Sequence, residues 1–143
     1  AGANRVLNGG TLQFSGASSQ STNRNFTINR PGGGIDASGT STNTITISGG
    51  STIAGGSPAF TLSGTNTSDN TISGVLSGDC AIVKSGAGRW VLSGNNTYTS
   101  TVTVSEGTLR LTGTPTSNAI KYTINAGTLS VPDRANLSPI PAA

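Results

Sequence analysis

The 143-residue sequence contains no histidine, no methionine and a single cysteine, and it has few charges and few aromatic rings. Charged residues make up 9% and aromatic residues 4% of the chain. A catalytic triad or a Cys–His pair needs an imidazole base, so both mechanisms are excluded. Histidine-ligated metal sites are excluded as well, and one cysteine cannot build a structural zinc site. We therefore expect no enzyme, no cofactor and no metal centre, and we expect Cys80 to be a small buried residue.

Long apolar runs and charge clusters are also missing. No segment approaches the roughly 20 apolar residues of a membrane-spanning helix, so no membrane insertion is expected. The net charge is +3, from eight basic and five acidic residues. The basic residues are scattered along the chain, whereas nucleic-acid-binding proteins gather them on one face. We therefore expect no nucleic-acid partner, and the pI of about 9.6 reflects the small number of charges.

The carboxylates are equally dispersed. They are Asp36, Asp69, Asp79, Glu106 and Asp133, and they are spread along most of the chain without a close pair. Hydrolases and lyases need carboxylates that cluster, so we interpret these as isolated turn residues. The run Gly32-Gly33-Gly34-Ile35-Asp36 is similar to the glycine-rich nonapeptide repeat that binds calcium. It occurs only once in this sequence, and its residue spacing differs from that of the repeat. We predict that this run forms a glycine-rich corner.

Small polar residues dominate what is present, because Gly, Ser, Thr and Asn account for 76 of the 143 residues. Val, Ile and Leu nevertheless recur in short bursts that alternate with polar residues, which favours a folded chain over a disordered linker. Period-two alternation is typical of strands with one buried face. The predicted strands are residues 11–14, 25–28, 44–47, 59–62, 81–84, 89–92, 101–104, 108–111, 121–124 and 128–131.

The same tripeptides recur at the boundaries of these strands. Gly-Thr-Leu begins at Gly10, Gly107 and Gly127, and Leu-Ser-Gly or Ile-Ser-Gly occurs five times. Recurring units of this size indicate stacked supersecondary elements, and a β-sandwich would not reuse the same tripeptides. We predict an all-β fold, a parallel β-solenoid of about seven coils of about 20 residues each. Residues 1–143 would form a single module with two open sheet edges, because neither end shows a charged cap or an amphipathic helix.

A family resemblance becomes specific over residues 84–109. Residues 84–99 read KSGAGRWVLSGNNTYT and residues 101–109 read TVTVSEGTL. This segment resembles the autotransporter-associated, or passenger-associated, β-strand repeat, and departs from it at Trp90, where an aliphatic is usual, and at Ser100, where glycine is usual. The resemblance implies a right-handed parallel β-helix in an exported bacterial protein, located outside the cell or on its surface. It does not imply an enzyme.

Two functional hypotheses follow. The first is a structural module of an extracellular fibre or surface passenger that polymerises head to tail, pairing the last coil of one copy with the first coil of the next. The sequence read from Ala143 back into Ala1 is consistent with one period of such a rod. The interface would comprise Leu7, Leu12, Phe14, Leu129, Val131, Asp133, Arg134, Leu137 and Ile140. The alternative is a glycan-binding adhesin segment of an autotransporter passenger, with Trp90, Tyr98 and Tyr122 as stacking platforms on the side of the rod.

Overall fold

The computed structural model describes residues 4–40, 42–53, 55–117 and 120–137. Within them the chain forms sixteen short strands and one 3₁₀ turn, η1. The elements are β1 (Arg5–Leu7), β2 (Thr11–Phe14), β3 (Gln20–Thr22), β4 (Phe26–Ile28), β5 (Gly32–Ala37), β6 (Ile45–Ile47), β7 (Ser51–Ile53), β8 (Ala59–Ser63), β9 (Asn70–Ile72), β10 (Leu76–Gly78), β11 (Ala81–Lys84), β12 (Arg89–Leu92), β13 (Thr101–Val104), β14 (Thr108–Leu111), β15 (Lys121–Ile124), β16 (Thr128–Ser130) and η1 (Arg134–Asn136).

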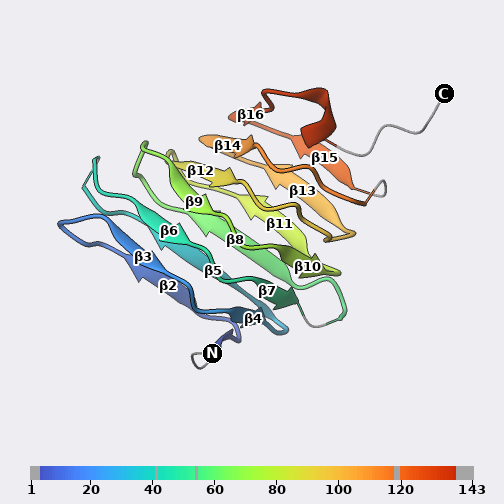
Figure 1. The fold of residues 1–143 in the computed structure, drawn as a ribbon, viewed down its shortest axis with the longest axis horizontal. Helices are drawn as coiled ribbons and strands as arrows, with labels where there is room; N and C mark the ends of the chain where they lie inside the picture. Colours follow the sequence, from blue (N-terminus) through green and yellow to red (C-terminus); the bar gives the residue numbers. More distant parts are fainter. Residues whose placement is uncertain (1–3, 41, 54, 118–119, 138–143) are drawn as a thin grey trace.

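The strands stack into three parallel sheets. Their orders are β1-β4-β7-β10, then β15-β13-β11-β8-β5-β2, and then β16-β14-β12-β9-β6-β3. Each turn of the chain adds one strand to each of the two longer sheets, and all the strand pairs are parallel. The first coil and the last coil therefore lie at opposite ends of the stack (Figure 1). This arrangement confirms the predicted parallel β-solenoid.

The solenoid has about six turns rather than seven, because its N-terminal coils are longer than its C-terminal coils. The coil that separates Phe26 from its strand partner Ser51 contains more residues than the coil that separates Trp90 from its partner Leu109. The predicted length of about 20 residues per coil fits the C-terminal coils and is too short for the N-terminal ones. The right-handed sense of the helix stays a prediction.

All ten predicted strands are present, with boundaries that agree to within one residue. The six strands that the alternation did not indicate are short or glycine-rich, and β5 is the clearest case. Its glycines were predicted to form a corner, but they lie in a six-residue strand. A Cβ on Gly33 would lie 2.5 Å from the Cβ of Leu7. The glycine run therefore reflects close packing of neighbouring coils, not a turn.

Inward-pointing residues of successive coils form columns, because the parallel register repeats at every turn. One column runs through Leu12, Ile35, Leu62, Lys84, Val104 and Ile124. Its four middle members are buried, while Leu12 is 38% and Ile124 is 49% exposed. Each fully buried aliphatic side chain stabilises the fold by about 1.5–3 kcal/mol. The core is thus continuous along the axis and open at its two ends.

One corner of the solenoid is built from stacked glycines. A Cβ on Gly74 would lie 2.0 Å from the carbonyl oxygen of Gly49, and a Cβ on Gly113 would lie 2.0 Å from that of Gly94. Gly94 stands between them in the stack, and a Cβ on Gly94 would lie 2.5 Å from the carbonyl oxygen of Gly74. No side chain fits at this spacing, so the corner selects glycine at every coil and explains the repeated Ser-Gly pairs.

Candidate functional site

The first coil carries polar side chains at positions that are apolar in the coil beneath it. Gln20 pairs with Ile45, and Thr22 pairs with Ile47. Arg5 pairs in the same way with Phe26. Since Phe26, Ile45 and Ile47 are buried, these polar residues lie over the open end of the core. Arg5 is the charged residue among these three, and its position over Phe26 was not expected from the sequence.

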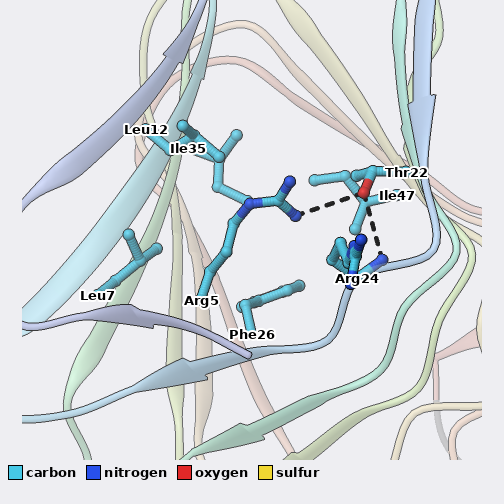
Figure 2. Close-up of a pocket in the computed structure, with 8 residues that line it drawn as sticks. All are labelled: Arg5, Leu7, Leu12, Thr22, Arg24, Phe26, Ile35 and Ile47. Atoms are coloured by element: carbon cyan, nitrogen blue, oxygen red, sulfur yellow. Dashed lines mark hydrogen bonds between the residues drawn. The ribbon is translucent and has the colours of Figure 1, made fainter. Parts of the chain in front are cut away.

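Arg5 lies across this end of the core, as Figure 2 shows. Its Nη1 donates a hydrogen bond of 3.3 Å to the Thr22 hydroxyl, which also accepts from the backbone N–H of Arg24 at 3.2 Å. Phe26 and Ile35 line the same pocket as the Arg5 side chain. No second side-chain bond from Arg5 is formed within the part of the chain that the structure describes. The end face therefore combines an apolar floor with unused cationic donors.

A hollow of about 250 Å³ continues this end face between β2 and β3. Arg5, Phe14 and Gln20 line it. The predicted interface residues Leu7 and Phe14 are partly buried here, and Leu12 is exposed. These three residues lie in the first coil, and their role in an interface stays a prediction.

The opposite end is more apolar. Leu129 and Val131 are partly buried, and Tyr122 lies beside them on the last coil. Asp133 and Arg134 are exposed at the start of η1, and Leu137 is partly buried. The predicted interface residue Ile140 lies outside the described residues.

A short segment packs against part of this end. The Asp133 carboxylate accepts a bond of 2.9 Å from the N–H of Ala135 and so caps η1. The Asn136 amide donates to the carbonyl oxygens of Thr112 and Gly113, both at 3.1 Å. The Tyr122 hydroxyl donates to the carbonyl oxygen of Leu137. These bonds hold residues 133–137 against the last coil, close to the glycine corner.

Two of the three predicted stacking platforms are core residues. Trp90 has none of its surface exposed, and Tyr98 has 1% exposed. The Trp90 indole N–H donates to the carbonyl oxygen of Ser63 at 2.8 Å, which satisfies its one polar atom inside the core. Neither ring has a free face for a sugar, so the expectation of stacking is wrong for both. Tyr122 is partly buried, and burial raises its pKa to about 12.

Lys84 is a fully buried lysine that the sequence analysis did not select as a candidate site residue. Its Nζ donates to the carbonyl oxygens of Ser85, Gly86 and Glu106, at 2.7, 2.6 and 3.2 Å. Burial lowers the pKa of Lys84 to about 8, while the negative charge of Glu106 acts in the opposite direction. The cation joins two neighbouring coils at one corner. The sequence indicated its burial only through the alternation of residues 81–84, in which Lys84 occupies an inward position.

The outer face of the sheet that contains β5 and β8 is rich in hydroxyl groups. One outward row consists of Thr11, Gly34, Thr61, Val83, Thr103 and Thr123. Because Gly34 has no side chain, the row is interrupted by a hollow of about 280 Å³, which Thr11 and Thr61 border. This hollow is a concave, polar feature on the side of the rod.

Asp36 lies in the next outward row of the same face, beside this hollow. Its carboxylate accepts hydrogen bonds from Ser38 at 2.5 Å, Ser63 at 2.9 Å and Gln13 at 3.2 Å. Burial acts to raise the pKa of Asp36, but the bonds from Ser38, Ser63 and Gln13 outweigh it and leave the pKa below its usual value. The carboxylate is therefore ionised at neutral pH, and it could accept hydrogen bonds from a ligand in place of those from its neighbours.

Metal and membrane sites are not found over the described ranges. Those residues contain no group of three or more His, Cys, Asp or Glu side chains that could hold a metal ion. No helix formed by them is long and apolar enough to cross a membrane.

Comparisons with known proteins agree with this geometry. Residues 82–111 match the model of the Passenger-associated-transport-repeat family. In an alignment of 132 residues that covers 84% of this chain, the sequence is 37% identical to the adhesin BmaC autotransporter of Brucella suis biovar 1 (strain 1330). The chain spans only 4% of the length of that relative. No solved structure matches the chain.

The fold is a parallel β-solenoid with a continuous core. The segment that matches the passenger-associated transport repeat, residues 82–111, runs from β11 to β14. The segment identified by resemblance over residues 84–109 is thereby confirmed. The repeat and the adhesin relative place the chain outside the cell, at the bacterial surface.

Proposed function

We propose that this chain is a rod segment of an autotransporter adhesin whose outer face binds glycans. The observation that carries the proposal is the position of the passenger repeat within one uninterrupted stack of coils. Its alignment with an adhesin over 84% of the chain supports the same proposal. The core provides a stiff shaft, and the outward rows of side chains provide the contact surface.

The contact surface in this proposal is the hollow over Gly34 together with Asp36. Sugars present several hydroxyl groups, each of which donates and accepts hydrogen bonds. Asp36, Gln13 and Ser63 offer a carboxylate, an amide and a hydroxyl side by side, and Thr61 borders the adjoining hollow. Trp90 and Tyr98 take no part, because they are buried.

The test is binding of the purified chain to an immobilised glycan array. The variant Thr61→Gln places a larger neutral side chain at the hollow and is expected to lower glycan binding at least about tenfold, a loss of about 1.4 kcal/mol. The matched control is Thr71→Gln, at an outward position of β9 in another sheet, and it should bind as the unmodified chain does. Absence of binding to every glycan, or an equal effect of the two substitutions, would overturn the proposal.

A further inference from the structure

Four asparagines in the chain have a serine or threonine two residues later, which is the acceptor motif for N-linked sugars. They are Asn25, Asn66, Asn95 and Asn136. A motif this short arises by chance in a chain so rich in Asn, Ser and Thr, so the surroundings of each side chain decide whether it is usable. The structure divides the four into two exposed and two buried asparagines.

Asn25 and Asn95 lie on the outside of the solenoid. In each motif the middle residue points inward and is buried, Phe26 in one and Asn96 in the other. Because side chains alternate along an extended chain, the asparagine and the threonine on either side point outward together. Both asparagines are exposed, and neither threonine is buried. The two groups that the motif requires are therefore presented to solvent side by side.

The two exposed asparagines make the same contact with the next coil. The Asn25 Oδ1 accepts the backbone N–H of Gly50 at 3.1 Å, and the Asn95 Oδ1 accepts that of Thr114 at 3.0 Å. Each amide is thus fixed to the corner through its oxygen. Within the described residues, the Nδ2 of these two asparagines donates no hydrogen bond. The nitrogen that would carry a sugar is available at both positions.

The other two asparagines use this nitrogen inside the fold. Asn66 is 1% and Asn136 is 5% exposed. The Asn66 Nδ2 donates to the carbonyl oxygens of Thr40 and Asn43. The Asn136 Nδ2 donates to two carbonyl oxygens of the preceding coil, both at 3.1 Å. A sugar on either nitrogen would break these bonds and force a buried side chain outward, so the folded chain does not tolerate one there.

We propose that Asn25 and Asn95 are N-glycosylated, each carrying one hexose transferred from a nucleotide-activated sugar. In the transfer, Nδ2 forms a bond to the anomeric carbon, and the bond from that carbon to the nucleoside diphosphate breaks. The nucleoside diphosphate leaves, and the amide loses one proton to a base of the transferase, so no electrons are gained or lost. The inference goes beyond the proposed glycan binding, because this sugar is attached covalently to the chain.

An exposed apolar side chain lies in the same corner column. The register of β4, β7 and β10, carried one residue back, aligns Asn25, Gly50 and Val75 on successive coils. Asn95 follows Val75 on the next coil. Val75 is 42% exposed, although it lies in the middle of the rod. Since neighbouring coils are about 4.8 Å apart, a hexose on Asn95 would lie over the Val75 side chain and shield it from water.

Mass spectrometry of the passenger recovered from the surface of the bacterium that exports it tests the proposal. Peptide fragmentation should place one hexose on Asn25 and one on Asn95, and none on Asn66. The variant Thr97→Val keeps Asn95 and its bond to the next coil but removes the hydroxyl of the motif. It should lose the hexose on Asn95 and keep the one on Asn25.

The matched control is Thr99→Val, which makes the same change at an exposed position outside the motif and should leave Asn95 modified. Valine keeps the branched shape of threonine, so both variants should give the circular dichroism of the unmodified chain. Absence of hexose from both exposed asparagines, a hexose that survives Thr97→Val, or a hexose on Asn66 would overturn the proposal. The glycan array is an independent measurement, because no residue of either motif lines the hollow over Gly34.

Discussion

Replacing one corner glycine with alanine is the sharpest test of the stacking geometry. In Gly74→Ala the new Cβ would lie 2.0 Å from the carbonyl oxygen of Gly49, whereas carbon and oxygen ordinarily approach to about 3.3 Å. The coils must separate by about 1 Å at this corner to relieve that contact. The separation stretches the bond from the Ser73 N–H to the Ile47 carbonyl, now 2.9 Å. Overpacking costs about 1–3 kcal/mol and a weakened bond about 1 kcal/mol, so we expect a loss of about 2–4 kcal/mol.

The matched control is Gly10→Ala, because a Cβ on Gly10 meets no atom within 4 Å. This change should alter the free energy of unfolding by less than about 0.5 kcal/mol. Urea titration followed by the fluorescence of Trp90, the single tryptophan, measures both variants. At an m-value of about 2 kcal/mol/M, the Gly74→Ala midpoint should fall by about 1–2 M. Equal midpoints for the two variants would refute the reasoning, because open and filled positions would then be equivalent.

Three further predictions concern buried side chains. Since Lys84 has a pKa of about 8 in the folded chain and 10.5 ordinarily, the unfolded chain binds more protons between these values. Stability should therefore rise with pH across this window relative to Lys84→Met, by at most about 1.4 kcal/mol per pH unit, in urea titrations at pH 8, 9 and 10. Trp90→Phe leaves the Ser63 carbonyl unpaired and should cost about 1–3 kcal/mol by circular dichroism, yet leave glycan binding unchanged. Cys80 is fully buried, and burial raises its pKa to about 12, so iodoacetamide should label it only in urea; rapid labelling of the folded chain would contradict the burial.

The alternating pattern predicted the strands well because a half-buried strand leaves a direct trace in sequence. Val102 and Val104 alternate with Thr101 and Thr103, and the structure buries only the valines. The pattern failed where glycine replaced the buried residue. In β5, neighbouring coils approach so closely that Gly33 occupies an inward position without a side chain. The alternation within one strand carries no information about the space that a residue one coil away leaves for a side chain.

The candidate sites were harder to predict for a related reason. In a chain with 4% aromatic residues, a rare Trp or Tyr is easily interpreted as a recognition residue on the surface. In the structure, Trp90 and Tyr98 lie in the core, where their large rings fill space inside the solenoid. The polar residues of the first coil were not predicted, because Arg5 and Gln20 lie far apart in sequence and line the same hollow only through the coil geometry.

The same repeat that builds the core also determines where chemistry can occur. Inward positions are committed to packing, and even the buried cation of Lys84 is consumed by three carbonyl oxygens. Recognition is therefore left to outward positions, such as the row that contains Asp36.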